Sequence, residues 1–565
     1  MKRELFAAFM MLAMGPASAQ QPPRGSGLPP PPTVLVQPSR ATSITVDLGK
    51  PLGPYKPIYA WFGYDEANFT TAEGGKKLLR ELHDLSPVPV HIRAHHLLTS
   101  GDSVPELKWS STNVYREDAS GKPVYDFTIL DGIFDEYKAA DVIPMVELGF
   151  MSKDLTSGTN EYQVHYPGRT TAGSVQAPPK DYAKWQELIR VVTAHLAQRY
   201  GADTVRQWYF EVWNEPDIDY WHGTPEQYWE LYDRAVAGVR AALPGAKVGG
   251  PAATGPSIEH ASTFLDGFLT HVTAAHVPLD FISFHVKGQP RIQDNEVVMG
   301  LAKEMKDADI GFGIIAKHGM GKLPIILSEA DPEGCAACSM KVNLANAYRN
   351  GTLYPSYTAA AYKGLFELAD RHQVNLISML SWSFEFEGKG YFEGFRSLST
   401  NGVDKPVLNF FRMAALMKGS RVATASTGQV KLDDVMAGGV RDAEDVDALA
   451  TTDAHQAAVM LWNYHDAEKA GEAKAASVAV RGLPKGVSRV RLTHYRIDDT
   501  HSNAYTVWKT MGSPQNPTPA QFAELKAKDG LQQLEPPREL DVRDGAVTVG
   551  TEMPSHSISL LKLDW

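Results

Sequence analysis

Eight short apolar runs, most of them separated by segments with helical spacing, constrain the fold of this chain more than any other feature. The apolar runs lie at residues 58–63, 89–96, 142–149, 208–216, 247–254, 281–288, 323–331 and 376–384. Helical periodicity is clearest at residues 75–85, 130–140, 181–200, 225–243 and 358–371. Alternating strands and helices are typical of a parallel sheet covered by helices. Eight repeats predict an α/β fold built on a (β/α)8 TIM barrel.

The pattern changes after Leu416, where short alternating runs are broken by glycine, proline and aspartate. The clearest of these runs lie at residues 457–464, 476–480, 487–495 and 558–563. They predict an all-β sandwich, completed by the strand-like residues 43–48. Because 565 residues exceed one ordinary domain, we expect a catalytic barrel at residues 51–418. Residues 36–50 together with 419–565 are expected to form the β-sandwich accessory domain.

The N-terminus has the pattern of a bacterial export signal. Met1 precedes two basic residues, residues 5–14 are mostly apolar, and Ala17 and Ala19 satisfy the small-residue rule for signal-peptidase cleavage. We therefore predict a signal peptide at residues 1–19, cleaved after Ala19, and a proline-rich linker at residues 20–35. The alternative is a frayed apolar N-terminus. The expected location is periplasmic or secreted.

The charge of the chain narrows the classes of partner. A formal net charge of −11 disfavours nucleic acid or an anionic membrane as the main partner, because both need a basic surface. No later run approaches the ~20 apolar residues of a membrane span, and no cysteine near the cleavage site offers a lipid anchor. The sequence implies no cofactor and no obligate protein partner.

Two of the apolar runs end on a glutamate. Residues 208–216 end in Asn214-Glu215-Pro216, where proline stops the strand, and residues 323–331 contain Glu329. The C-terminal ends of barrel strands carry catalytic groups. Glycoside hydrolysis needs two carboxyl groups, roughly 5–5.5 Å apart in retaining enzymes. Glu215 and Glu329 are therefore the catalytic candidates; the alternative is that each acid merely begins a polar loop.

The two cysteines, Cys335 and Cys338, follow Glu329 closely. In an oxidising compartment we expect a disulfide across this short loop. A C-x-x-C pair also serves in redox sites, but no thioredoxin-like βαβ pattern surrounds this one. Zinc would need further ligands that the local sequence does not offer.

Several motifs together resemble glycoside hydrolase family 39, which contains β-xylosidases and α-L-iduronidases. The likeness spans nearly the whole chain after the leader. The motifs lie at residues 91–98, 125–127, 143–151, 208–216, 281–285, 324–332, 495–498 and 506–518. An Asn-Glu-Pro sequence alone is shared by many barrel glycosidases, whereas the combination is much more specific.

The resemblance implies a retaining double displacement with Glu215 as general acid/base and Glu329 as nucleophile. Arg93 matches the family arginine that would hold the charge of Glu329; the alternative is an ordinary structural ion pair. Asn214 matches the asparagine that binds the 2-hydroxyl of the sugar.

Further side chains are expected around the same sugar. The resemblance implies that His95 and His285 donate hydrogen bonds to it, whereas we expect the adjacent His96 to pack in the core. Neighbouring strand residues face opposite ways, so a metal site on the two adjacent histidines is not expected. Trp382 is the candidate for the apolar floor under the sugar ring, with core packing as its alternative. Glu147, at the end of the third run, is a weaker candidate for binding substrate.

Lys287 departs from the tyrosine that family xylosidases tend to carry at this place. Together with Arg396 it resembles the carboxylate-binding pair of the iduronidase branch; alternatively, it bonds a neutral sugar or pairs with an acid of the site. Residues 335–338 and 501–508 instead look most like exported bacterial β-xylosidases. We therefore predict an exo-acting β-xylosidase that cleaves xylo-oligosaccharides. The alternatives are an α-L-iduronidase-like enzyme acting on a terminal uronate and, as a minor one, a non-catalytic carbohydrate-binding protein.

Overall fold

The structure is a computed structural model that describes residues 41–159, 161–166, 169–333, 335, 338–382, 384–469 and 471–565. The signal peptide predicted at residues 1–19 and the linker at residues 20–35 lie outside this part of the chain. Among the helices that the structure describes, none is both long and apolar enough to cross a lipid bilayer.

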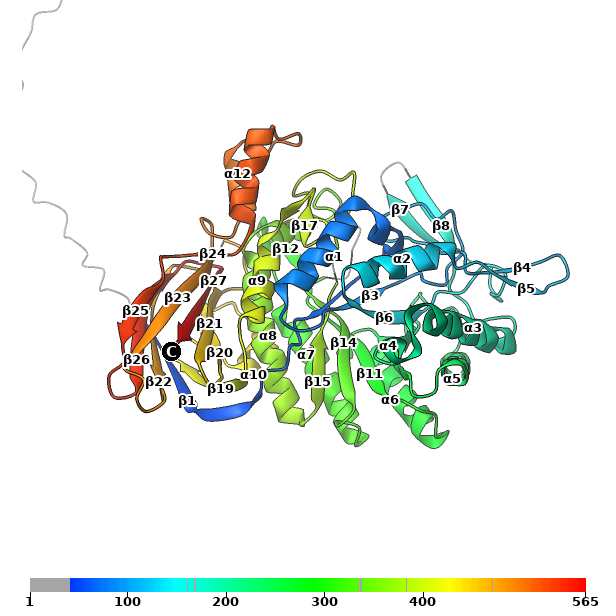
Figure 1. Cartoon of the computed structure of the whole chain (residues 1–565), viewed down its shortest axis with the longest axis horizontal. Coiled ribbons are helices and arrows are strands. Elements are labelled where there is room, and N and C mark those ends of the chain that lie inside the picture. Colours follow the sequence, from blue (N-terminus) through cyan, green and yellow to red (C-terminus); the bar gives the residue numbers. More distant parts are fainter. Residues whose placement is uncertain are drawn as a thin grey trace, which may run out of the picture. The chain divides into compact units, whose positions relative to one another are not determined.

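The predicted barrel is confirmed as one parallel sheet, and the helices around it can be followed in Figure 1. Its strands are β2 (Trp61–Tyr64), β3 (His91–Ala94), β6 (Ile143–Leu148), β9 (Tyr209–Val212), β10 (Lys247–Ala253), β11 (Phe281–Lys287), β14 (Pro324–Asp331), β15 (Asn375–Met379) and β16 (Ser381–Trp382). Strand β16 continues β15 after Leu380. Because β15 pairs with β14 while β16 pairs with β2, these two short pieces act as one eighth strand that closes the barrel.

A helix follows each barrel strand in turn. These helices are α1 (Glu73–Leu85), α2 (Thr128–Ala139), α3 (Tyr182–Tyr200), α5 (Pro225–Ala242), α6 (Glu259–Ala274), α7 (Leu301–Lys317), α8 (Leu353–His372) and α9 (Pro406–Ala415), with α4 (Ala202–Val205) after α3. Local sequence fixes some of their starts. Asp181 accepts hydrogen bonds from the first turn of α3, and Thr224 forms a capping box with Gln227 at the start of α5. All five helical segments predicted from periodicity are present.

Short hairpins and turns interrupt the loops at the ends of the barrel. They are β4 (Tyr115–Glu117) with β5 (Pro123–Tyr125), β7 (Glu161–Tyr166) with β8 (Arg169–Val175), β12 (Arg291–Gln293) with β13 (Glu296–Val298), β17 (Ser399–Thr400) with β18 (Val403–Asp404), and the 3₁₀ turns η1 (Ala67–Thr71) and η2 (Leu344–Asn350).

The C-terminal β domain is one mixed sheet that curls around its own core. Its strands are β1 (Thr42–Pro54), β19 (Ser420–Ser426), β20 (Asp445–Thr452), β21 (Gln456–Tyr464), β22 (Lys474–Arg481), β23 (Arg489–Ile497), β24 (Gln532–Gln533), β25 (Arg538–Asp541), β26 (Ala546–Met553) and β27 (Ser557–Asp564). Strand β1, blue in Figure 1, lies between β19 and β22 and pairs with both. The N-terminal strand is thus part of the sheet formed by the C-terminal strands.

Strand β21 has apolar residues on both faces because both faces are buried. Val459 and Leu461 pack into the core of the β domain, whereas Met460 and Trp462 belong to the core of the barrel. A strand covered on two sides reads as a continuous apolar run rather than as an alternating one. The β domain therefore packs against barrel helix α8 through one face of this strand.

Three helices of the β domain were not predicted. They are α10 (Leu432–Gly438), α11 (Ala504–Thr510) and α12 (Pro519–Asp529). The start of α12 carries a sequence signal, because Thr518 and Gln521 form a capping box and Pro519 occupies the first helical position.

Candidate active site

The turn that follows β9 places Asn214 and Glu215 at the C-terminal end of the barrel. Strand β9 stops at Val212, and Trp213 and Glu215 both have left-handed backbone angles, with φ of 70° and 46°. Such angles cost a non-glycine residue on the order of 1–3 kcal/mol and are kept where the surroundings enforce them. Here the backbone N–H of Trp213 donates to Leu148 O (3.2 Å) and that of Glu215 donates to Ala252 O (3.0 Å). Neighbouring strands on both sides thus fix this turn.

A cavity of about 260 Å³ opens at this end of the barrel. Six of the predicted site residues line it: His95, Asn214, Glu215, Glu329, Trp382 and Arg396. The other three do not line the cavity but contact the residues that do. Arg93 and Lys287 contact Glu329, and His285 contacts Glu215. The structure therefore brings all nine predicted side chains to one place.

Arg93 connects several of the buried carboxylates. Its side chain is fully buried, and its Nε donates to Glu211 Oε2 (2.5 Å) while Nη2 donates to Asn214 Oδ1 (2.9 Å). Its Nη1 lies 3.4 Å from Glu329 Oε1, and Nη2 lies 3.2 Å from Glu147 Oε2. A guanidinium group suits this role because it presents several donors in a fixed plane. Glu147 therefore contacts Arg93, which accounts for a charge at the end of β6.

Glu329 is held in its ionised form by the cations around it. Lys287 Nζ lies 2.8 Å from Glu329 Oε2, and Arg396 Nη1 lies 3.9 Å from the same oxygen. Burial alone would raise the pKa of Glu329, but the charges of Lys287, His285 and Arg396 hold this pKa well below its usual range. A carboxylate that stays ionised in a buried cavity is suited to act as a nucleophile.

Asp331, the last residue of β14, joins the two cations that were predicted to bind a substrate carboxylate. Lys287 Nζ donates to Asp331 Oδ1, and Arg396 Nη1 donates to Asp331 Oδ2 (3.2 Å). Both carboxylate side chains, Glu329 and Asp331, are almost fully buried. The two cations are thus balanced by two carboxylates of the protein itself.

His95 forms a second buried ion pair beside the cavity. Its Nδ1 lies 2.6 Å from Asp65 Oδ1 and its Nε2 lies 3.0 Å from Glu147 Oε2. Burial opposes protonation, but Glu147 and Asp65 outweigh it and raise the pKa of His95 to about 9. The ring of His95 also packs on Trp382, with 4.3 Å between the ring centroids. His96 points elsewhere, toward Trp109, and burial lowers its pKa to about 3.

His285 contacts the predicted acid/base directly. A hydrogen bond of 2.8 Å joins His285 Nδ1 to Glu215 Oε1, and the imidazole is fully buried. Glu215, His285 and Glu329 each offer one ligand atom within 4.8 Å of the others, a spacing that a metal ion would accept. However, Lys287 and Arg93 already approach Glu329, and two cations beside one ligand disfavour a third.

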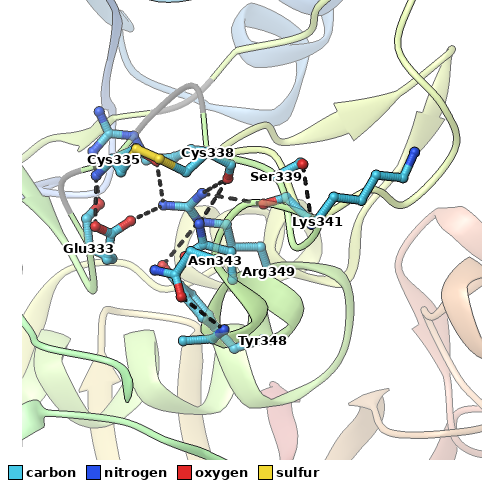
Figure 2. The surroundings of a disulfide bond; sticks show 12 residues. Glu333, Cys335, Cys338, Ser339, Lys341, Asn343, Tyr348 and Arg349 are labelled. Atoms are coloured by element: carbon cyan, nitrogen blue, oxygen red, sulfur yellow. Dashed lines mark hydrogen bonds and ion pairs between the residues drawn. A yellow bond between two sulfur atoms is a disulfide. The ribbon is translucent and has the colours of Figure 1, made fainter. Parts of the chain in front are cut away.

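The loop that follows Glu329 is held by a disulfide and an arginine. Cys335 and Cys338 are bonded to each other, with 5.4 Å between their Cα atoms. Figure 2 shows Arg349 against this loop: its Nη2 donates to Glu333 Oε2 (2.7 Å) and to Cys335 O (3.0 Å), and its Nη1 donates to Cys338 O (3.1 Å). Because Cys335 lines the cavity, this network positions one part of its wall.

Sequence reasoning missed four residues of the cavity wall: Asp65, Lys108, Ile218 and Tyr220. Asp65 follows β2 directly, so its position after a barrel strand was a usable signal. Lys108 and Tyr220 lie in irregular loops, where no periodicity indicates which side chains turn inward.

The family of the protein follows from comparison with known sequences. The model of glycosyl hydrolases family 39 matches residues 92–542. The chain belongs to glycoside hydrolase family 39. It is therefore a glycoside hydrolase, and enzymes of this family act on oligosaccharides. The predicted resemblance is confirmed.

Proteins similar to this chain include β-xylosidases and α-L-iduronidases. A β-xylosidase from Geobacillus stearothermophilus is 26% identical over 490 residues, which cover 84% of this chain and 86% of the relative. An α-L-iduronidase from Canis lupus familiaris is 27% identical over 479 residues, covering 79% and 67%. The crystal structure of a monomeric β-xylosidase from Caulobacter crescentus CB15 shares the fold, with a TM-score of 0.73, 22% identity and coverage of 93% and 99%.

Proposed function

We propose that this protein is a retaining, exo-acting β-xylosidase that releases xylose from xylo-oligosaccharides. One observation carries the mechanism: Glu215 and Glu329 reach the same cavity, and carboxylate oxygens of the two lie within 4.8 Å of each other. This separation fits a retaining enzyme, whose carboxyl groups lie about 5–5.5 Å apart, and leaves too little room for the water of an inverting one.

In the first step, Glu329 attacks the anomeric carbon while Glu215 gives its proton to the glycosidic oxygen. The bond to the leaving group breaks as an ester to Glu329 forms. Lys287 contacts one oxygen of Glu329 and Arg93 contacts the other. These contacts orient the attacking carboxylate and keep it ionised. Asn214 Oδ1 is engaged by Arg93, which leaves the amide Nδ2 to donate to the sugar 2-hydroxyl.

In the second step, Glu215 takes a proton from water, and the water oxygen displaces Glu329 from the anomeric carbon. The configuration of the sugar is retained because two inversions occur at the same carbon. His285 orients Glu215 through the 2.8 Å hydrogen bond. Trp382, which is 1% exposed and packed against His95 and Arg93, supplies an apolar side to the cavity.

The charge balance of the site favours a neutral sugar. A substrate carboxylate needs unpaired positive charge in a buried cavity. Lys287 and Arg396 instead face Glu329 and Asp331, so two positive charges meet two negative ones before any substrate binds. A uronate would add a third negative charge to this set.

An α-L-iduronidase-like activity is the second candidate. Arg396 lines the cavity, as does Lys108, and the family contains iduronidases that are similar to this chain. For this activity, Arg396 must release Asp331 and bind the carboxylate of the substrate instead.

Hydrolysis of matched chromogenic glycosides by the purified protein tests the proposal. We expect the β-D-xyloside to be cleaved faster than the α-L-arabinoside and far faster than the α-L-iduronide. A preference for the iduronide would replace the first candidate by the second. Binding of xylo-oligosaccharides without cleavage of any glycoside would instead indicate a non-catalytic carbohydrate-binding protein.

We further propose that the protein is exported and that residues 1–19 are removed. The pattern of basic, apolar and small residues in this segment supports the proposal. Mass spectrometry of protein recovered from the periplasm or medium should give an N-terminus at Gln20. An intact N-terminus on cytoplasmic protein would contradict it.

A further inference from the structure

A second and larger hollow lies beside the catalytic cavity. This groove has a volume of about 940 Å³ and is lined by residues 216–223 and the N-terminal halves of α5 and α6, where Trp229 and Phe264 form its apolar floor. The rings of these two residues pack together, with 4.8 Å between their centroids. In a parallel barrel, helices begin at the end where strands finish, so the groove opens at the same end as Glu215. Its volume is within the usual range for ligand sites, about 300–1,000 Å³.

The groove adjoins the catalytic cavity at the loop that follows Glu215. Residues 216–219, which follow Glu215 directly, line the groove, and Ile218 lines both the groove and the cavity. In the proposed reaction, Glu215 protonates the oxygen of the leaving group. The leaving group must therefore lie on the Glu215 side of the cavity, and the residues that follow Glu215 line the groove.

The chemistry of the groove suits neutral carbohydrate. An aromatic floor packs against the C–H faces of sugar rings, and carboxylates accept hydrogen bonds from hydroxyl groups. The rim provides Asp219, Glu226 and Glu259, all exposed, and a single facing imidazole, His260. This excess of negative charge repels anionic ligands.

Ile258 provides an accessible apolar contact at the edge of the groove. Its side chain is 43% exposed and occupies the N-cap position of α6, where it makes no capping hydrogen bond. An exposed isoleucine at a position that favours serine or aspartate contributes nothing to the helix. Its exposed side chain is available for contact with a ligand in the groove.

We propose that this groove binds the leaving-group portion of a neutral oligosaccharide, while the sugar to be released occupies the cavity. This inference rests on the proposed function, because it uses Glu215 as the proton donor. It extends that function, because it predicts that the enzyme prefers oligosaccharides whose leaving group is long enough to reach the groove.

The test compares substrates that differ only in their leaving group. β-D-xylosyl fluoride releases fluoride and cannot reach the groove, whereas xylotetraose extends a chain of sugars into it. Two variants alter the groove: Trp229→Ala, and Ile258→Ser, which places a favoured cap at the start of α6. Ile310→Ser is the matched control, because Ile310 is similarly exposed, at 39%, and lies on α7 outside the groove.

We expect kcat/KM for xylotetraose to fall about tenfold in Trp229→Ala and about fivefold in Ile258→Ser, with Ile310→Ser unchanged. The rate on xylosyl fluoride should remain that of the unmodified protein in all three. Equal rates on xylotetraose in Ile258→Ser and the unmodified protein would overturn the inference. Failure of the unmodified protein to cleave xylosyl fluoride would instead overturn the proposed function.

Discussion

Two clusters of buried charge in this molecule both combine basic side chains with carboxylates, but their properties differ. The first, here called the mouth cluster, consists of Arg93, Lys287 and Arg396 with Glu329 and Asp331. It borders a cavity of about 260 Å³. Arg93, Lys287 and Arg396 all lie within 3.9 Å of Glu329, whose pKa is held low despite burial.

The second cluster, here called the α8–β20 cluster, lies where the barrel meets the β domain. Lys363 of α8 donates to Asp447 of β20, and Asp445 accepts from Trp462 Nε1 (2.8 Å). Here a single cation, Lys363, is shared by Asp447, Asp445 and Glu367. Burial and then repulsion from Asp447 raise the pKa of Asp445 to about 7. The neighbouring space is only about 30 Å³.

The comparison shows what separates a reactive site from a structural ion pair. Burial is common to both clusters and therefore does not identify function. In the mouth cluster several cations contact the same carboxylate beside a space for a ligand, which keeps Glu329 ionised and reachable. The α8–β20 cluster lacks both, so we expect it to support the fold alone.

The largest expected effect is on activity in the mouth cluster. Glu329→Ala removes the proposed nucleophile, so kcat/KM for a β-xyloside should fall by about 10⁴-fold or more. The fold should persist, because Lys287 keeps Asp331 as a partner. Steady-state kinetics and circular dichroism measure the two properties. Asp447→Asn is the control in the other cluster, and a comparable loss of activity there would remove the distinction between them.

Removal of Lys363, the single cation of the α8–β20 cluster, should lower the stability of the protein rather than its activity. Lys363→Met leaves two buried acids facing each other, which should lower the free energy of unfolding by about 3 kcal/mol or more. Activity per folded molecule should not change. Denaturant unfolding and active-site titration measure these quantities. A folded but inactive Lys363→Met variant would show that the cluster acts on catalysis.

Removal of one cation from the mouth cluster should change the pH dependence of catalysis. In Lys287→Met the largest attraction that lowers the pKa of Glu329 is gone, so burial raises this pKa. The acidic limb of the pH–rate profile should then move to higher pH, and kcat should fall on the order of 10- to 100-fold. An unchanged acidic limb would mean that Lys287 does not control the charge of Glu329.

The sequence predicted most strands and helices of the fold, but it did not predict which strands lie next to each other in the β domain. The eight barrel strands and the helices α1, α2, α3, α5 and α8 follow from periodicity. The strand at residues 43–48 was correctly assigned to the C-terminal β domain, but its neighbours in the sheet, β19 and β22, were not predicted. The same limit applies to charge. The family resemblance paired Arg93 with Glu329 across 236 residues, but nothing in the sequence indicated that Arg93 also contacts Glu147 and Glu211.

Residues without a local pattern were missed for the same reason. Asp331 stood in a recognised motif, yet its contacts with Lys287 and Arg396 depend on barrel closure. Glu211 lies inside an apolar strand. A charged residue at such a position indicates that a buried partner exists, but the sequence does not show that this partner is Arg93.

The smallest expected effects separate the two clusters by pH. Folding raises the pKa of His95 from about 6.5 to about 9, so its contribution to stability is complete below pH 6.5 and is lost as the pH rises to 9. For Asp445, raised from 3.8 to about 7, the contribution is complete below pH 3.8 and is lost by pH 7. His95→Gln should flatten only the upper window, and Asp445→Asn only the lower one. Unfolding free energies measured from pH 4 to 9 test this, and one shared window would contradict it.

The central claim is that Glu329 forms a covalent bond with a neutral sugar. Its most direct test is mass spectrometry of the protein after reaction with 2-deoxy-2-fluoro-β-D-xylosyl fluoride, which slows the second step more than the first. We predict one added fluoroxylosyl group, located on the peptide that contains Glu329 and absent in Glu329→Ala. A label on another carboxylate, or labelling by a 2-fluoroiduronyl reagent alone, would contradict the account.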